Sequence, residues 1–277
     1  MNSFTALDFL GEASLINISE NSKKLDIELM INSLLNLDRI NLHTNPPVIT
    51  EGQRMELFSM ISRRNKGEPL AYILGNKGFW NMDFVVNEHV LIPRPETETM
   101  IEKVLERFGE LPLTLLDAGT GCGAIALTLA NERKQWSVFA NDRSKKALQI
   151  AKKNKQILKV PVNFLISNWL ETFENESFDL IVSNPPYIEE NNPCLEEDGI
   201  KYEPLSALVS KGNGLDDLKE IIVRSYICLK KGGHLFLEHA PWQTIEIKKI
   251  LFESNFISVE VFNDLNGDER ISTALKP

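Results

Sequence analysis

The 277-residue chain is long enough for one α/β domain and a smaller companion, and its 43% hydrophobic and 25% charged residues are typical of a folded globular protein. The formal net charge of −9 opposes tight binding of bare nucleic acid, because neutralising phosphate needs clustered Lys and Arg. No stretch approaches the ~18 apolar residues of a membrane-spanning helix, and the N-terminal stretch carries Asp8 and Glu12 without a basic start, so we expect a cytoplasmic protein.

Residues 1–75 are predicted to form a small helical domain. The apolar positions at roughly helical spacing are Leu25, Leu29 and those from Ile31 to Leu35. Thr50 and Gln53 have the spacing of a capping box, which would open a helix carrying Phe58 and Ile61. This domain is too short to enclose an active site. Its seven basic and nine acidic side chains do not favour nucleic acid, so a folded protein with a basic surface is the more natural partner.

Residues 76–95 are predicted to form a β-hairpin linker. The β-favouring residues of this stretch are Phe79, Trp80, Phe84, Val85, Val86, Val90 and Leu91, and turn formers lie among them. Pro93 and Pro95 then fix two φ angles, and Pro95 disfavours helix at Arg94. The linker therefore ends in a stiff entry to the next domain.

Residues 96–277 alternate between helix and strand patterns. The predicted strands are Leu113–Asp117, Ser137–Asn141, Val162–Ile166, Asp179–Ser183, His234–Glu238, Ser258–Phe262 and Ile271–Leu275. Alternating elements of this kind imply a mostly parallel, doubly wound sheet with helices on both faces. We therefore predict an α/β fold with a Rossmann-like, seven-stranded sheet.

A glycine-rich loop follows the first of these strands. Gly119, Gly121 and Gly123 let the backbone turn sharply and approach a ligand closely. Asp117 precedes the glycines at the strand end, and Asp142 follows the next strand, where a carboxylate can accept hydrogen bonds from ribose hydroxyls. Two plainer interpretations stay open: a tight strand-to-helix turn, and Asp142 as the cap of a helix that begins near Ser144.

The ligand of this loop is predicted to be S-adenosylmethionine. The glycine spacing is G-x-G-x-G and not the dinucleotide pattern G-x-G-x-x-G. The carboxylate of Asp117 would repel a pyrophosphate but suits a ligand with ammonium and sulfonium charges. Both features favour S-adenosylmethionine over NAD.

The most specific feature is Asn184-Pro185-Pro186-Tyr187 at the end of the fourth strand. A planar amide or aromatic amine is a poor nucleophile, because its nitrogen lone pair is delocalised. The Asn184 side-chain oxygen and the Pro185 carbonyl could hold both N–H groups and favour a pyramidal nitrogen, while Tyr187 stacks on the flat group. The motif therefore indicates methyl transfer to such a nitrogen. A rigid turn without chemistry is the alternative.

Together these motifs resemble the class I amino-methyltransferases. Further stretches resemble one branch, the peptide chain release factor glutamine N5-methyltransferases (HemK family). They are Glu68 to Gly75, Phe79-Trp80, Leu91 to Glu98, and Asp264-Leu265 with Gly267 and Arg270. The resemblance covers essentially the whole chain. It implies a methyltransferase, with residues 1–75 docking the substrate protein and residues 96–277 binding S-adenosylmethionine.

The resemblance also implies roles for individual residues. The glycine loop would hold the methionine part of the cofactor, Asp142 its ribose and Trp169 its adenine. The implied cofactor-binding residues are Asp117, Gly119, Thr120, Gly121, Cys122, Gly123, Asp142, Asn168, Trp169 and Asn184. The implied substrate-binding residues are Arg94, Glu96, Asn184, Pro185, Pro186 and Tyr187, with Asn184, Pro185 and Tyr187 also catalytic.

Three positions depart from the family pattern. Asn168 stands where the family usually has Asp. Its amide oxygen can still accept a hydrogen bond from the adenine amino group, but it carries no negative charge. Glu238-His239-Ala240 replaces a Glu-x-Gly sequence, which puts the local backbone in question. Cys122 is a small-residue variation in the glycine loop. No metal is expected, because the cysteines are odd in number and far apart and the histidines lack an i, i+4 pair.

The leading hypothesis is methylation of the glutamine in the Gly-Gly-Gln motif of peptide chain release factors by a monomeric enzyme. The main alternative is an adenine or cytosine N-methyltransferase acting on DNA or RNA, because the Asn184 motif serves an exocyclic amine equally well. That chemistry would call for base flipping and a basic target-reading domain. The acidic balance opposes it. A third interpretation is a protein that binds the cofactor without turnover.

Overall fold

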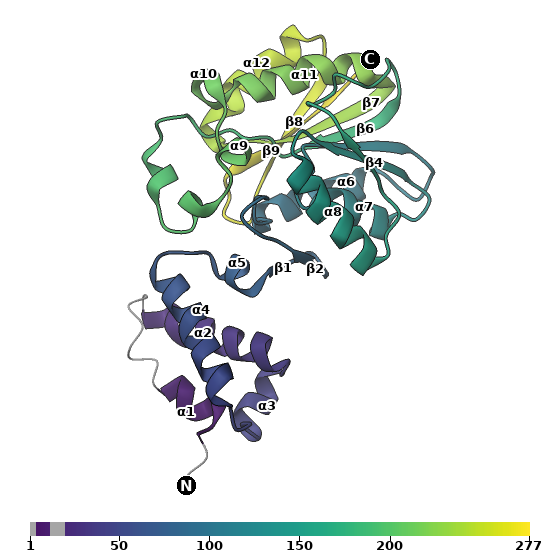
Figure 1. Ribbon diagram of the computed structural model, residues 1–277. Coiled ribbons are helices and arrows are strands. Elements are labelled where there is room, and N and C mark those ends of the chain that lie inside the picture. The colour runs from purple at the N-terminus through teal and green to yellow at the C-terminus, as the bar shows by residue number, and fades with distance from the viewer. Residues whose placement is uncertain (1–3, 12–19) are drawn as a thin grey trace. The chain divides into compact units, whose positions relative to one another are not determined.

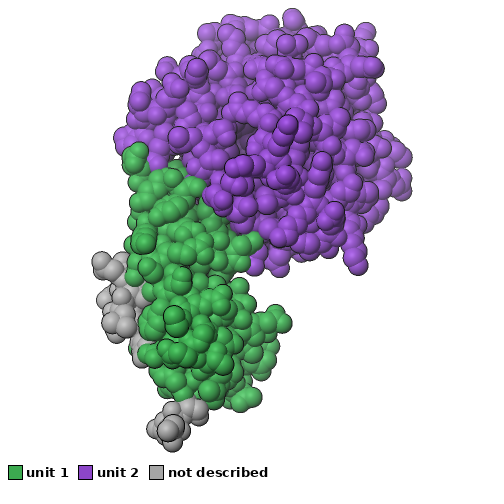
Figure 2. Space-filling model, viewed as in Figure 1, with its two compact units in different colours: residues 1–75, 196–202 green, residues 76–195, 203–277 purple. Residues whose placement is uncertain are grey.

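The computed structural model describes residues 4–11 and 20–277, which form two compact units (Figures 1 and 2). The first unit consists of residues 1–75 and 196–202, and the second of residues 76–195 and 203–277. Glu12, one of the two acidic residues of the N-terminal stretch, lies outside the described residues. Among the helices that are described, none combines the length and the apolar composition needed to cross a bilayer.

The first unit is built from helices, as the sequence predicts. Its helices are α1 (Ala6–Gly11), α2 (Glu20–Leu35), α3 (Arg39–Thr44), α4 (Glu51–Asn65) and α5 (Leu70–Leu74). The predicted capping box at the start of α4 is confirmed: the Gln53 backbone N–H donates to Thr50 Oγ1 at 3.2 Å, and the Thr50 N–H donates to Gln53 Oε1 at 2.8 Å.

The helix predicted from Leu25, Leu29 and the residues from Ile31 to Leu35 is α2, but these apolar positions do not share one buried face. Leu25 and Leu29 are 46% and 38% exposed, whereas Ile27, Met30 and Ile31 are buried in the core of the unit. A helix turns about 100° per residue, so positions two away from Ile27 point to nearly the opposite side. Because apolar residues lie on both sides of this helix, the sequence pattern alone does not indicate which face is buried.

A short segment from far along the chain completes the first unit. Residues 196–202 include the 3-10 turn η4 (Ile200–Tyr202). The Gly199 N–H donates to the Gly67 carbonyl at 2.9 Å, and the Tyr202 hydroxyl donates to the Lys66 carbonyl at 2.7 Å. The predicted first domain, residues 1–75, does not include this segment.

The second unit begins with the predicted hairpin. Strands β1 (Asn76–Phe79) and β2 (Met82–Val85) pair antiparallel, with Phe79 opposite Met82. The chain then runs without helix or strand to the 3-10 turn η2 (Pro95–Thr97). The two prolines predicted to stiffen this entry precede and open that turn.

The main sheet has seven strands in the order β5-β4-β3-β6-β7-β9-β8, which confirms the predicted Rossmann-like fold. The strands are β3 (Thr114–Ala118), β4 (Ser137–Asp142), β5 (Asn163–Ile166), β6 (Phe178–Ser183), β7 (Leu229–Glu238), β8 (Ile257–Asn263) and β9 (Glu269–Leu275). Strands β3 to β7 pair in parallel, and β9 pairs antiparallel with both β7 and β8. Strand β7 starts earlier than predicted, at Leu229.

Helices lie on both sides of this sheet (Figure 1). They are α6 (Glu98–Arg107), α7 (Ala124–Glu132), α8 (Lys145–Leu158), α9 (Leu205–Leu208), α10 (Lys211–Gly214), α11 (Asp216–Cys228) and α12 (Thr244–Glu253). The remaining 3-10 turns are η3 (Pro193–Glu196) and η5 (Pro241–Gln243). Because both faces are covered, β3 and β6 are almost continuously buried, as parallel strands usually are.

The central strands β3 and β6 lie side by side, although two strands and two helices separate them in the chain. Strand order reverses at this pair, and ligands of open α/β sheets bind outside the carboxyl ends of the strands at such a point. The glycine loop follows β3 and the Asn184 loop follows β6. The topology therefore brings the two predicted motifs to one place.

Asn154 fastens the hairpin to the glycine loop. Its side chain is fully buried on α8 and accepts from the Val85 N–H at 2.8 Å. Its Nδ2 donates to the carbonyls of Val85, at 3.0 Å, and Cys122, at 2.9 Å. One side chain thus satisfies three backbone groups of two separate segments.

We predict that Asn154→Ala destabilises the protein by about 2–4 kcal/mol, because it leaves buried backbone groups without partners. The free energy of unfolding in urea measures this loss. Asn163→Ala, at an exposed position of β5, is the matched control and should change stability by less than about 0.5 kcal/mol. Equal losses in the two variants would contradict the assignment.

Candidate active site

The glycine loop makes a tight turn between β3 and α7. Gly119 and Gly121 have φ angles of 80° and 56°, which favour glycine, and Gly123 is the N-cap residue of α7. The N–H groups of Gly119 and Thr120 both donate to the Asn141 carbonyl, at 3.0 and 2.9 Å. The loop is therefore anchored to the end of the neighbouring strand β4.

Asp117 lies beneath the loop and is fully buried. Its Oδ2 accepts from the Thr120 hydroxyl at 2.6 Å and from the Ala126 N–H at 3.2 Å. Its Oδ1 has no hydrogen-bond partner among the described residues. Burial raises the pKa of this carboxyl to about 7, and the nearby charge of Asp142 adds to the shift. The group can thus respond to a cation placed near it.

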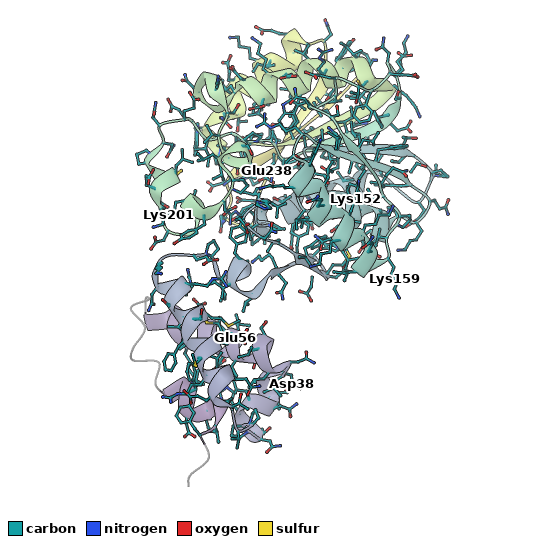
Figure 3. The ribbon with its side chains drawn as sticks, in the orientation of Figure 1. Asp38, Glu56, Lys152, Lys159, Lys201 and Glu238 are labelled. Atoms are coloured by element: carbon teal, nitrogen blue, oxygen red, sulfur yellow. The ribbon has the colours of Figure 1, made fainter. Side chains whose placement is uncertain are left out.

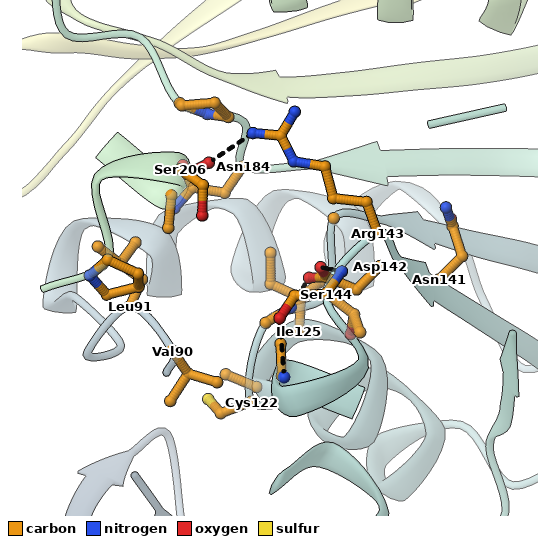
Figure 4. Close-up of a pocket in the computed structure, with 18 of the residues that line it drawn as sticks. Val90, Leu91, Cys122, Ile125, Asn141, Asp142, Arg143, Ser144, Asn184 and Ser206 are labelled. Carbon is orange, nitrogen blue, oxygen red and sulfur yellow. Dashed lines mark hydrogen bonds between the residues drawn. The ribbon is translucent and has the colours of Figure 1, made fainter. Parts of the chain in front are cut away.

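Asp142 links the glycine loop to α8. Its Oδ2 accepts from the Gly121 N–H at 3.0 Å, and its Oδ1 accepts from the Ser144 N–H at 2.8 Å (Figure 4). The side-chain cap of α8 is Ser144, whose Oγ accepts from the Ala147 N–H. Burial raises the pKa of the Asp142 carboxyl. Asp142 therefore holds both the loop and the start of the helix, while each oxygen retains a lone pair for a ligand.

Trp169 packs directly over Gly119. The indole is 7% exposed and its Nε1 donates to Asp217 at 2.9 Å. A Cβ atom built on Gly119 would lie 2.7 Å from a ring carbon of Trp169. The neighbouring Asn168 donates through Nδ2 to Glu171 at 3.0 Å. The ring is thus part of the core as well as part of the ligand-binding edge.

The Asn184 loop continues from β6 and is fixed at several points. Ser183 donates through its hydroxyl to the Ala118 carbonyl at 2.6 Å, which ties the ends of β6 and β3 together. Asn184 donates through Nδ2 to Thr97 Oγ1 at 3.2 Å. The Tyr187 carbonyl accepts from Gln243 at 3.1 Å, and burial raises the pKa of the Tyr187 hydroxyl. Hydrogen bonds from three sides therefore hold the loop around its amide side chain.

Arg94 is held by a carboxylate of another segment. It forms an ion pair with Glu203, which is 4% exposed and whose Oε2 also accepts from the Ile92 N–H at 3.1 Å. Burial raises the pKa of Glu203, and Arg94 opposes that shift. This pair connects the entry of the second unit to the chain that follows the Asn184 loop.

These segments surround one cavity of the second unit, with about 930 Å³ of empty space including its opening to solvent. The predicted site residues that line it are Arg94, Gly119, Thr120, Gly121, Cys122, Asp142, Asn168, Trp169, Asn184 and Pro186. Five others do not reach the lining: Glu96, Asp117, Gly123, Pro185 and Tyr187.

Sequence reasoning missed several residues of this site. Arg143 lines the cavity and donates to the Ser206 carbonyl at 3.1 Å (Figure 4), and Thr97 and Asn141 also line it. Arg143 directly follows Asp142, so its position could have been inferred from the same strand end. Glu203 carried no such signal, because it lies in an irregular stretch.

The backbone questioned at Glu238-His239-Ala240 is ordinary. Ala240 has φ −76° and ψ 148°, an extended conformation that any residue adopts. The alanine therefore fits here without strain.

We predict that Gly119→Ala is more damaging than Gly121→Ala. Both positions have positive φ, which costs an alanine about 1 kcal/mol. Only at Gly119 does the added methyl group also clash, because nothing lies within 4 Å of a Cβ at Gly121. We expect Gly119→Ala to lose about 1–3 kcal/mol more in urea unfolding. Similar losses of stability in the two variants would show that Trp169 can move to accommodate a methyl group at Gly119.

Comparisons with known proteins agree with this architecture. Residues 96–197 match the family model of the methyltransferase small domain, and residues 10–75 match that of the PrmC N-terminal domain. Among solved structures, a methyltransferase from Pyrococcus furiosus has a TM-score of 0.55 at 17% identity and covers 82% of this chain and 99% of its own. A T. thermophilus 16S rRNA methyltransferase in complex with AdoMet and guanosine has a TM-score of 0.56 at 20% identity, covering 73% of this chain and 50% of its own. These two similarities establish the fold.

Much closer relatives cover nearly the whole chain. The release factor glutamine methyltransferase of Pseudomonas aeruginosa is 41% identical over 253 residues, 91% of this chain and 92% of its own. Its namesake from Pasteurella multocida is 38% identical over 95% of both chains, and that from Escherichia coli is 38% identical over 81% of both. On this evidence the chain belongs to the release factor glutamine methyltransferase family.

Proposed function

We propose that this protein transfers a methyl group from S-adenosylmethionine to the side-chain amide nitrogen of the glutamine in the Gly-Gly-Gln motif of peptide chain release factors. One observation carries the proposal: Asn184 and the glycine loop line the same cavity, at the carboxyl ends of adjacent strands. Methyl donor and acceptor amide can meet there. Since release factors act in translation, the proposed place of action is the cytoplasm.

The residues of the cavity fit S-adenosylmethionine. The glycine loop offers a close backbone approach for the methionine part, and Asp142 offers carboxylate oxygens for the ribose. Trp169 and Asn168 line the part of the cavity assigned to the adenine. Two buried oxygens lack hydrogen-bond partners among the described residues: Asn141 Oδ1, from a residue that lines the cavity, and Asp117 Oδ1, from a residue beneath the glycine loop that does not. Buried acceptors of this kind suit a ligand that carries an ammonium group.

The chemistry asks little of the protein beyond positioning. When bound, S-adenosylmethionine supplies a methyl group on a cationic sulfur. The side-chain oxygen of Asn184 would accept one N–H of the substrate amide and the Pro185 carbonyl the other, which favours a nitrogen lone pair directed at the methyl group. The nitrogen forms the new N–C bond, the electron pair of the broken S–C bond stays on sulfur, and the nitrogen then gives one proton to water.

The remaining predicted residues would shape the substrate side. Tyr187 is assigned to pack against the flat amide, with Pro186, Arg94 and Glu96 bordering the entrance. We assign substrate docking to residues 1–75, the linker role to residues 76–95 and catalysis to residues 96–277. We expect a monomer that makes no direct contact with nucleic acid or membrane.

The decisive experiment offers labelled S-adenosylmethionine and three acceptors: a folded release factor, its Gln→Ala variant at the Gly-Gly-Gln motif, and duplex DNA. Mass spectrometry then locates the added methyl group. We expect one methyl group on the glutamine and none on the variant or the DNA. Methyl on adenine or cytosine would replace the proposed substrate by nucleic acid.

The role of Asn184 is tested by Asn184→Ala. We predict a fall in kcat of about 100-fold or more, because an interaction that positions the reacting nitrogen is lost. The dissociation constant of S-adenosylmethionine, measured by calorimetry, should stay within about threefold. Asn163→Ala on the exposed face of β5 is the control. Weak cofactor binding with unchanged kcat would instead assign Asn184 to the cofactor.

The affinity for S-adenosylmethionine should depend on pH through Asp117. Its pKa of about 7 in the free protein must fall when an ammonium group binds nearby, so binding releases protons below that pH. We predict that affinity rises from about pH 5.5 to pH 7.5 and then levels off. Calorimetry in buffers of different ionisation enthalpy counts the protons. Asp117→Asn should abolish the dependence, and its persistence would move the titration to Asp142.

A further inference from the structure

We propose that Thr97 and Glu238 are positioning residues that fix the orientation of the Asn184 side-chain amide, so that its oxygen and not its nitrogen faces the substrate. The inference rests on the proposed function, because that function requires Asn184 to accept a hydrogen bond from the substrate amide. Three elements distant in the chain contribute the three side chains: η2, the loop after β6, and the end of β7.

The sheet brings these side chains together. Ser183 pairs with Leu237 in the parallel ladder of β6 and β7, so Asn184 and Glu238 follow at the same level. Thr97 ends the 3-10 turn η2, immediately before α6. Thr97 is 4% exposed and Glu238, labelled in Figure 3, is 1% exposed. Both side chains are therefore shielded from bulk solvent.

The hydrogen bonds form a chain with one direction. The Thr97 hydroxyl donates its single proton to Glu238 Oε2 at 2.6 Å. The Thr97 oxygen therefore has only lone pairs left, and it accepts from Asn184 Nδ2 at 3.2 Å. An ionised carboxylate can only accept hydrogen bonds. Glu238 therefore makes Thr97 its donor, and Thr97 in turn makes the Asn184 nitrogen its donor.

This order decides which end of the amide remains for the substrate. If the amide were turned over, the Asn184 oxygen would face the Thr97 oxygen with no proton between them, and the Asn184 nitrogen would face the substrate N–H. Both contacts would be repulsive. With the observed order, the amide oxygen stays available at the cavity, which Asn184 and Thr97 both line. Thr97 thus lies at the cavity as well as behind the Asn184 nitrogen.

Among the residues that the structure describes, the Glu238 carboxylate has no Lys or Arg at contact distance. Within the described part of the chain, no Lys or Arg forms an ion pair with Glu238 at 4 Å or less. Burial is the largest influence on the pKa of Glu238 and raises it to about 7. The hydrogen bond from Thr97, the charge of Arg270 and the contact with Asn184 lower this pKa, while Glu96 raises it, and the charge of Glu238 in turn acts on Tyr187. For a purely structural role, an uncharged side chain would avoid the free-energy cost of burying a carboxylate.

Protonation of Glu238 should reverse the chain. A carboxylic acid can donate to the Thr97 oxygen, and the Thr97 hydroxyl can then donate to the Asn184 oxygen. The Asn184 nitrogen would turn toward the substrate, where an acceptor is required. The orientation is therefore secured only while Glu238 is ionised, and kcat should decline below about pH 7.

The test compares Thr97→Val, Thr97→Ser and Glu238→Gln. Thr97→Val keeps the shape but removes the hydroxyl, so kcat should fall about 10- to 100-fold, while KM for the release factor and the cofactor dissociation constant change little. Thr97→Ser restores the hydroxyl and should recover most of kcat. Glu238→Gln should lower kcat near pH 8 and remove the acid limb of its pH profile.

A matched control and a second readout separate positioning from folding. Thr273→Val removes a buried hydroxyl of β9 that has no partner among the described residues, and it should leave kcat and its pH profile unchanged. In nitrogen-labelled enzyme, the Asn184 side-chain amide resonances, assigned by their loss in Asn184→Ala, should shift with pH in wild type and not in Glu238→Gln. This readout needs no turnover and remains available if Thr97→Val fails to fold.

The outcomes separate the positioning role of Thr97 and Glu238 from the proposed function. An active wild type, together with wild-type kcat and an unchanged pH profile in Thr97→Val and Glu238→Gln, overturns the positioning role and leaves the proposed function intact. A wild type that methylates no release factor overturns the proposed function. In that case the pH response of the Asn184 amide still shows whether Glu238 controls its orientation.

Discussion

The site depends on the hydrogen-bonded contact between β3 and β6. These strands are neighbours in the sheet although far apart in the chain, and the Ser183 hydroxyl joins their ends by donating to the Ala118 carbonyl. The glycine loop and the Asn184 loop start one residue beyond this bond. Their separation is therefore set by the spacing of adjacent strands and not by loop contacts, and strand spacing is among the most constant dimensions in proteins.

The site is built around carboxyl groups that folding does not favour. Asp117 and Glu238 are buried, and burial raises the pKa of each to about 7. An unfolded carboxyl ionises near pH 4, so the folded form holds these protons more tightly between about pH 4 and pH 7. The contribution of both groups to stability is thus present in acid and is lost as the pH rises through 7. The buried apolar clusters of the sheet must offset this cost at neutral pH.

Much of the fold could be predicted from the sequence because its signals are local. Turn residues and alternating patterns marked every strand of the sheet, and the spacing of Thr50 and Gln53 marked a helix start. The two loops were also predictable, since glycine and proline restrict the backbone in recognisable ways. The roles assigned to their individual side chains remain proposals.

Other features depend on contacts between distant segments, which no local pattern encodes. The spacing of apolar residues predicted the helix α2 but not its buried side, because Leu25 and Leu29 are exposed whereas Ile27 is buried. Thr97 and Glu238 meet because the fold brings η2 and the end of β7 together beside the Asn184 loop. Glu203 becomes a partner of Arg94 across more than a hundred residues. In each case the burial or the partner of a side chain is set by the tertiary fold.

The return of residues 196–202 to the first unit has a practical consequence for dividing the protein. The chain passes from one unit to the other at residue 75, again near residue 195 and again near residue 202. Deletion of residues 1–75 would therefore remove the carbonyls of Gly67 and Lys66, which accept hydrogen bonds from Gly199 and Tyr202. The same segment joins the Asn184 loop to Glu203. Loss of activity on deleting the helices would thus reflect a disturbed second unit as much as the loss of the proposed docking, and point substitutions on the helical surface are the cleaner way to separate the two.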